Sequence, residues 1–178
     1  MAIKATVYKA YLQISDMDRN YYQNHALTLA QHPSETIERM MIRLLVFALH
    51  AHEDLSFTRG ISSNDEPDLW LKLPGDDIDT WIDLGQPDEK RIRKACGRAR
   101  EVFIYTYDQR SAVVWWKQMN NKLDRFDNLH VIAIPGDTGI SLAQLAERSM
   151  TIQCSIQDNE IWIGDVRNNV HVVPEVLK

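Results

Sequence analysis

The sequence contains little cysteine and no long hydrophobic run. Its two cysteines, Cys96 and Cys154, lie far apart and outside any C-x-x-C arrangement, which is typical of a reduced, cytoplasmic setting. No stretch approaches the roughly 18 uncharged apolar residues that a membrane helix needs. The first eight residues alternate apolar and polar types, where a secretory signal would carry a charged region followed by an apolar block. We therefore expect a cytoplasmic protein without a membrane partner.

The chain also lacks internal repeats and low-complexity linkers. Its 178 residues, 44% of them apolar, suit a single domain over residues 1–178. The net charge of −5 argues against a general nucleic-acid coat protein. Between Asp88 and Arg100, however, six basic residues accompany two acidic ones, so this segment carries +4 and the rest of the chain −9. The segment is either a solvated helix face or a contact surface.

Hydrophobic periodicity predicts a mixture of strands and helices. The predicted strands are residues 3–14, 21–30, 55–59, 68–73, 78–84, 102–107, 129–134, 150–156 and 160–163. The predicted helices are residues 34–52, a segment that starts at Pro87, residues 111–120 and residues 141–148. The first helix follows Pro33, with Ser34 as its expected N-cap. This order predicts an α/β (α+β) fold, with one mixed central sheet flanked by helices.

The strands at 68–73 and 78–84 flank the turn sequence Pro74-Gly75-Asp76-Asp77, which predicts a hairpin. If those four residues form the loop, Leu73 lies opposite Ile78 and the numbers of opposed residues sum to 151. This register places Trp70 opposite Trp81, Lys72 opposite Asp79, and Asp68 opposite Asp83. Strand alternation then sorts the side chains onto two faces. The predicted core face holds Leu69, Leu71, Leu73, Ile78, Thr80, Ile82 and Leu84.

The other face would bring Asp68 and Asp83 together. Opposed residues have Cβ atoms about 4.5–5.5 Å apart, so two aspartates there need a compensating cation, a shared proton or open solvent. Two carboxylates with water suit Mg²⁺, which prefers oxygen ligands. The alternative is a solvated face in which the Lys72–Asp79 pair and the tryptophan pair stabilise the hairpin.

Two further elements bear on this hairpin. Glu38 lies at the edge of the apolar arc of its helix, where a carboxylate is partly desolvated unless it meets a partner, or where it interacts with the helix N-terminus. Arg91, Lys94 and Arg98 follow a spacing of i, i+3 and i+7 along the basic helix, which starts just after the strand of Asp83. Cations placed there could contact phosphates or stabilise a developing negative charge.

Several motifs resemble the YaeQ family, and the likeness covers nearly the whole chain. They are His32-Pro33-Ser34-Glu35-Thr36-x-Glu38-Arg39-Met40-Met41, Phe57-Thr58-Arg59-Gly60, Asp65-Glu66-Pro67, Trp81-Ile82-Asp83-Leu84-Gly85-x-Pro87-Asp88, Lys94-Ala95-Cys96, Trp115-Trp116 and Met150-Thr151-Ile152-Gln153. That family in turn resembles PD-(D/E)XK nucleases, so the resemblance implies a variant of the restriction-endonuclease-like core.

In PD-(D/E)XK nucleases a helix glutamate, a strand aspartate and a second acidic residue bind a divalent metal. The resemblance places Glu38, Asp68 and Asp83 in these roles, with Mg²⁺ or Mn²⁺ as the implied cofactor. The chain departs from the pattern because Gly85 stands where a lysine is expected, two residues after Asp83. Lys94 is the implied substitute for that lysine.

Two functions follow as expectations. In the first, the protein is a metal-dependent nuclease in which Glu38, Asp68 and Asp83 hold the metal, Gln86 positions water or substrate, and Lys94 stabilises the transition-state charge. In the second, it is a noncatalytic module. The basic helix, through Arg91, Lys94 and Arg98, and an exposed Trp70–Trp81 pair would then contact nucleic acid or a protein partner.

Overall fold

The computed structural model describes residues 4–178, which form two compact units. The first unit comprises residues up to Leu49 together with Asp137–Pro174, and the second comprises His50–Gly136 and Glu175–Lys178. Ile3, the first residue of the first predicted strand, lies outside the described residues. The single domain over residues 1–178 stays a prediction. No helix within residues 4–178 is long and apolar enough to cross a membrane.

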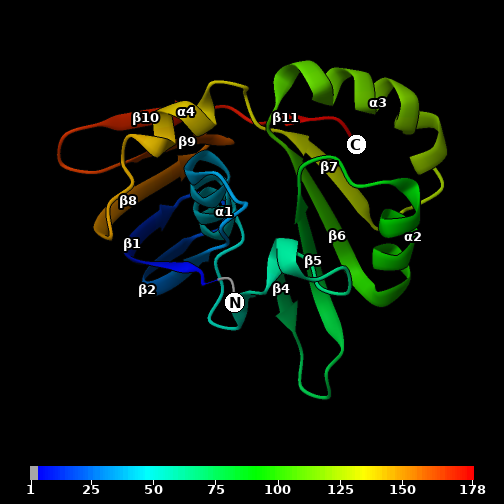
Figure 1. Cartoon of the computed structure of the whole chain (residues 1–178), viewed down its shortest axis with the longest axis horizontal. Helices are drawn as coiled ribbons and strands as arrows, with labels where there is room; N and C mark the ends of the chain where they lie inside the picture. The colour runs from blue at the N-terminus through cyan, green and yellow to red at the C-terminus, as the bar shows by residue number, and fades with distance from the viewer. Residues whose placement is uncertain (1–3) are drawn as a thin grey trace. The chain divides into compact units, whose positions relative to one another are not determined.

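The first unit is built on a five-stranded mixed sheet, within the described residues, of order β10-β9-β8-β1-β2 (Figure 1). Its central neighbours β1 and β8 are parallel, and the other pairs are antiparallel. Alternate residues of β1 are buried, which gives this sheet one core face. The strands are β1 (Thr6–Asp16), β2 (Tyr21–Gln31), β8 (Ser149–Gln157), β9 (Glu160–Gly164) and β10 (Asn169–Val172).

Two helices belong to this first unit, α1 (Ile37–Leu49) and the short α4 (Thr138–Ala143). Every residue of α1 from Met40 to Ala48 is buried, so the helix is a core element and not a surface one. The predicted N-cap was wrong, because the hydroxyl that accepts the N–H of Arg39 belongs to Thr36, at 3.1 Å. Ser34 instead bonds the ring of His32, at 2.6 Å.

The second unit is built on a six-stranded mixed sheet of order β11-β7-β6-β5-β4-β3 within the described chain (Figure 1). The strands β5, β6 and β7 are parallel, and the remaining pairs are antiparallel. The strands are β3 (Leu55–Phe57), β4 (Leu69–Lys72), β5 (Ile78–Leu84), β6 (Ala99–Thr106), β7 (Leu129–Ala133) and β11 (Glu175–Val176). The fold is therefore mixed α+β as predicted, but with two sheets in place of one.

The parallel strands of the second unit are joined by α2 (Glu89–Arg98) and α3 (Gln109–Leu123), and a short 3-10 helix, η1 (Gly60–Ser62), follows β3. Such crossover helices are what parallel neighbours require. Asp88 caps α2 and Asp108 caps α3. Both helices pack on one face of the sheet around Trp81 and Trp115 (Figure 1). This packing places the start of α2 next to the end of β5, where the predicted site lies.

Candidate acidic site on the second unit

The predicted hairpin register is correct over the part that carries the acids. Leu69 pairs with Ile82 and Trp70 with Trp81, and the N–H of Asp68 donates to the carbonyl of Ile82 at 2.9 Å. Asp68 and Asp83 therefore come from adjacent segments of the hairpin. Both are buried, with only 4% and 2% of their surface exposed. Two carboxylic acids in such surroundings require local compensation if they are ionised.

The turn end of the hairpin differs from the prediction. A bulge shifts the register, so Lys72 pairs with Ile78, and the predicted pairs Lys72–Asp79 and Leu73–Ile78 were wrong. The cause is a wider turn, in which the N–H of Leu73 donates to the carbonyl of Asp77 at 2.8 Å. Its tip has two left-handed residues, Gly75 at φ 93° and Asp76 at φ 66°. The ammonium of Lys72 lies 4.1 Å from the centre of the Trp70 ring.

The tryptophan pair is not an exposed platform, and that expectation was wrong. Trp70 and Trp81 do contact edge to face, with ring centres 6.3 Å apart. Trp81, however, is only 1% exposed and belongs to the core beneath α2 and α3. Because β5 is covered on both faces, the side of the hairpin that appeared solvated is a second core face. Ile78, predicted on the opposite face, belongs to this core with Trp81 because of the bulge.

The compensating cation of the acid pair is Arg91. Its Nε lies 2.8 Å from Asp83 Oδ2 and its second guanidinium nitrogen 2.8 Å from Oδ1, a bidentate ion pair. Asp83 Oδ2 also accepts the indole N–H of Trp81 at 3.1 Å. The hydrogen bonds to Asp83 raise the pKa of Arg91 above its usual value, and the charge of nearby Asp68 acts in the same direction. The Asp83 carboxylate thus has its charge neutralised inside the protein.

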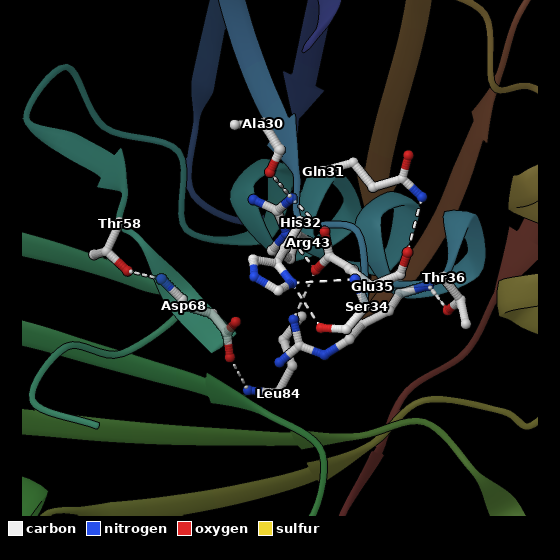
Figure 2. A network of polar contacts seen from close by, with 12 residues as sticks. Ala30, Gln31, His32, Ser34, Glu35, Thr36, Arg43, Thr58, Asp68 and Leu84 are labelled. Carbon is white, nitrogen blue, oxygen red and sulfur yellow. Dashed lines mark hydrogen bonds and ion pairs between the residues drawn. The ribbon is translucent and has the colours of Figure 1, made fainter. Parts of the chain in front are cut away.

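Asp68 is held by backbone groups. Its Oδ2 accepts the N–H of Leu84 at 2.8 Å (Figure 2). The backbone carbonyl of Asp68 accepts the N–H of Thr58 at 3.2 Å. Gly60 approaches the other carboxylate oxygen so closely that a Cβ there would lie 3.2 Å from Asp68 Oδ1. Gly60 also has a left-handed φ of 52°. The segment before β4 is therefore shaped closely around this carboxylate.

The basic stripe predicted on α2 exists, but its members bind the segment before β4. Arg91 donates to the carbonyls of Asn64 and Glu66 at 3.2 and 2.9 Å. Lys94 pairs with the carboxylate of Asp65 at 2.5 Å, and this hydrogen bond lowers the pKa of Asp65. Arg98 donates to the carbonyl of Asp65 at 2.9 Å. The three cations tie the loop to the helix.

Other cations of this region remain outside that network. Lys90, Arg93 and Arg100 are exposed, and none of their side chains forms an ion pair or hydrogen bond with a residue of the described chain. Arg98 is also exposed, and its guanidinium carbon lies 5.1 Å from the centre of the Trp81 ring. The basic surface presented to solvent is thus shifted around α2 from the predicted stripe.

The remaining predicted residues are Gln86, which has another partner, and Glu38, which belongs to the first unit. Gln86 is exposed, and its amide nitrogen donates to the hydroxyl of Ser111 at 2.5 Å. Glu38 belongs to the other unit, in the first turn of α1, where Gly139 of α4 approaches its Cβ. Within residues 4–178, its carboxylate forms no hydrogen bond or ion pair. Its predicted role as a metal ligand stays a prediction.

A buried ion pair in the first unit was not foreseen. Arg43 and Glu35 are 4% and 6% exposed and form a bidentate contact of 3.0 and 2.6 Å (Figure 2). Arg43 also donates to the carbonyl of Ala30 at 3.0 Å, and Arg39 reaches Glu35 at 2.8 Å. A charged residue at position 43 inside the apolar stretch of α1 was the signal available in the sequence. The group links α1 to the end of β2.

The residues present do not fit a divalent metal in this arrangement. No cluster of three or more His, Cys, Asp or Glu side chains with metal-binding geometry occurs in the part of the chain that the structure describes. Both oxygens of Asp83 are bonded by Arg91, and one accepts Trp81 as well. Three donors already occupy these oxygens, and a divalent cation beside the guanidinium would meet like-charge repulsion. A metal at Asp83 would therefore compete with Arg91 for the carboxylate.

Sequence and structure comparisons agree on one group of proteins. A family model described as YaeQ protein matches residues 1–174. The chain is 49% identical to the uncharacterized protein YaeQ of Salmonella typhi and 48% identical to that of Escherichia coli K12. Each of these alignments covers 97% of this chain and 95% of the relative.

Two solved structures are similar over almost their whole length. The YaeQ protein from Xanthomonas axonopodis pv. citri is 50% identical, with a TM-score of 0.95 and 98% of both chains covered. The YaeQ protein from Pseudomonas syringae is 34% identical, with a TM-score of 0.93, covering 98% of this chain and 96% of that one.

Proposed function

The chain belongs to the YaeQ family, and from that premise we propose that it is a noncatalytic nucleic-acid-binding module on a nuclease-like fold. The observation that carries this proposal is the bidentate contact between Arg91 and Asp83. It supplies, from within the protein, the positive charge that a nuclease site takes from its metal. The acid pair then acts in folding, by joining β5, α2 and the loop before β4.

The binding surface in this proposal is the exposed basic side of α2. Lys90 and Arg93 are one helical turn apart and therefore project from the same side, and Arg100 follows at the start of β6. Because these cations lack acidic partners in the described chain, they can contact phosphate oxygens without first breaking an internal ion pair. Such contacts recognise the nucleic-acid backbone and carry no sequence information by themselves.

Fluorescence anisotropy with labelled single- and double-stranded oligonucleotides, measured over a range of salt concentrations, tests this proposal. The variant Lys90→Glu/Arg93→Glu reverses two charges of the surface. We expect it to weaken binding about tenfold or more and to reduce the salt slope by roughly 2, one for each lost phosphate contact. The control, Lys4→Glu/Arg167→Glu, changes the net charge equally on the other unit. Equal loss in both variants would mean that only net charge matters and would refute this surface.

The second candidate is the metal-dependent nuclease, which the burial of two acids on neighbouring segments of one hairpin favours. In it, Glu38, Asp68 and Asp83 hold Mg²⁺ or Mn²⁺, with Gln86 and Lys94 in the roles that the family resemblance implies. When bound, the metal would polarise a phosphodiester and activate water. The arrangement of Arg91 on Asp83 weighs against this candidate.

Calorimetric titration of Mg²⁺ and Mn²⁺ separates the two candidates. The noncatalytic proposal expects no saturable binding to the wild type at millimolar metal. A single site that disappears in both Asp68→Asn and Asp83→Asn would overturn it. Metal-dependent cleavage of nucleic acid that Asp83→Asn abolishes would establish the nuclease.

A further inference from the structure

The first sheet ends on one side at β2, an edge strand without the usual protection (Figure 1). It is 11 residues long, whereas the other terminal strands, β10, β3 and β11, have four, three and two residues. Its sequence, YYQNHALTLAQ, contains no proline and no Asp, Glu, Lys or Arg. Its register with β1 is continuous from Tyr21 to Gln31, without a bulge. Natural edge strands are normally shortened, charged, bulged or covered, because they otherwise pair with another strand.

The hydrogen bonds of β1 show which backbone groups of β2 point outward. The N–H of Lys9 donates to the carbonyl of Arg148, just before β8, so odd-numbered residues of β1 point toward β8 and even-numbered ones toward β2. Ala10 pairs with Leu27, so the odd-numbered residues of β2 bond β1. The residues whose N–H and C=O point away are Tyr22, Asn24, Ala26, Thr28 and Ala30. The contact of Ala30 supports this assignment, because its carbonyl accepts a hydrogen bond from Arg43 of α1 at 3.0 Å and so points away from β1.

We propose that this edge pairs antiparallel with β2 of a second copy of the same chain, about a two-fold axis at Ala26. In this register Ala26 lies opposite Ala26, Asn24 opposite Thr28, and Tyr22 opposite Ala30. Each outward residue meets an outward residue, so the strands can exchange both N–H and C=O bonds at the Ala26–Ala26 and Asn24–Thr28 pairs, whereas the carbonyl of Ala30 already accepts from Arg43. The 11 residues give a seam about 37 Å long at 3.4 Å per residue.

The charge pattern makes a second copy a suitable partner. Two identical strands placed antiparallel bring like residues near each other, and like charges directly opposed destabilise a sheet. Because β2 has no acidic residue, lysine or arginine, no such opposition arises in its paired form. Two-fold pairing of one surface with itself is also the commonest symmetry of soluble oligomers.

Pairing would also cover exposed apolar surface. Tyr22 is 53% exposed, and in this register its ring lies beside Ala30 of the second copy. The neighbour of Ala30 on β1 is Val7, which is 47% exposed. The small side chain of Ala30 leaves room for the tyrosine ring to reach Val7. Both ends of the seam gain this contact, since the axis repeats it.

Light scattering coupled to size exclusion, over a range of concentrations of the full chain, tests the proposal. We expect a mass of twice 20.6 kDa that falls to 20.6 kDa on dilution. Ala26→Pro removes one outward N–H and leaves the bonds between β1 and β2 in place, so it should give the monomer at all concentrations. Ala26→Ser keeps the N–H and should still dimerise. Circular dichroism confirms that each variant is folded.

Hydrogen exchange gives a second, residue-level readout. The amides of Asn24, Ala26 and Thr28 should become protected only at concentrations where the dimer forms, whereas those of His25 and Leu27 stay protected throughout. A wild-type monomer with fast exchange at the even positions at every concentration would overturn the proposal. So would a dimer that survives Ala26→Pro, or an extended peptide that binds this edge while the chain itself does not associate.

Discussion

Replacing Arg91 by methionine tests the role assigned to the ion pair most directly. Methionine keeps much of the apolar stem but removes both hydrogen bonds to Asp83 and those to the carbonyls of Asn64 and Glu66. The side chain of Asp83 is 3% exposed in the native chain, and in the variant the indole of Trp81 would be its remaining donor among these contacts. A buried carboxylate that loses its cation has to stay charged at a cost or take up a proton.

The expected magnitude follows from this burial. Removing one partner of a buried pair costs about 3–5 kcal/mol of unfolding free energy. The side chain of Arg91 is 27% exposed and therefore keeps some hydration in the pair, and Asp83 still accepts the indole N–H of Trp81 in the variant. The lower end of this range of about 3–5 kcal/mol therefore applies. We expect a loss of about 3 kcal/mol, which for a chain of this size corresponds to roughly 6–12 °C in melting temperature.

Urea unfolding of four proteins forms a double-mutant cycle: wild type, Arg91→Met, Asp83→Asn and the double variant. In the Asp83→Asn background, Arg91→Met should cost about 1 kcal/mol, because only hydrogen bonds to neutral carbonyl oxygens are lost and no ion pair is broken. The matched control Arg93→Met, an exposed cation of the same helix, should change stability by less than about 0.5 kcal/mol. If Arg91→Met costs the same in both backgrounds, the ion pair is not the compensating contact and the reasoning fails.

Three further perturbations are expected to give measurable results. Burial lowers the pKa of His25 below its usual 6.5, so the unfolded chain binds a proton at this residue more readily than the folded chain. The free energy of unfolding should therefore fall as the pH drops below about 6.5. His25→Gln should flatten that dependence in urea titrations, and an unchanged slope would contradict the assignment. Burial raises the pKa of Cys96 to about 11 and that of Cys154 to about 12, so at pH about 8 only about one Cys96 in a thousand is a thiolate. Iodoacetamide labelling followed by mass spectrometry should therefore be slow in the folded chain and fast in urea, whereas rapid native labelling would refute this. Gly164→Ala should lower the free energy of unfolding by more than about 2 kcal/mol, because the added Cβ would overlap the backbone carbonyl of the residue four positions later. Gly97→Ala on α2 adds a Cβ that meets nothing within 4 Å, so it should raise the free energy of unfolding by about 0.5–1 kcal/mol. Equal thermal shifts in the two variants would contradict the close approach at Gly164.

The elements that were predicted well are those whose pattern is local. The apolar spacing of α1, the strand of Asp83 and the helix start near Pro87 all depend on residues within one or two turns of each other. The hairpin register near the acids was also predictable, because only a short turn connects the strands that carry Trp70 and Trp81. The bulge was not, because it depends on Asp76 adopting a left-handed conformation that Asp tolerates but does not require.

The face assignment failed for a different reason. Alternation along a strand separates two faces but does not reveal whether a helix covers the second one. From the sequence, Trp81 was predicted to be exposed beside Trp70, but α2 and α3 cover it in the structure. The same packing decides which cation reaches Asp83. Arg91 lies in the first turn of α2, beside the end of β5, whereas Lys94 lies one turn further along and meets Asp65 instead.

The parallel pairing of β1 with β8 has a consequence for the order of folding during synthesis. Lys9 pairs with Ser149, so β1 waits for β8, the central strand of its sheet, which is made 140 residues later. By then the ribosome has released most of His50–Gly136, which forms the second compact unit together with Glu175–Lys178. Closing so long a loop is slow, because its entropy is lost before its contacts form. We expect the second unit to fold on the nascent chain while β1 and β2 remain exposed to chaperones.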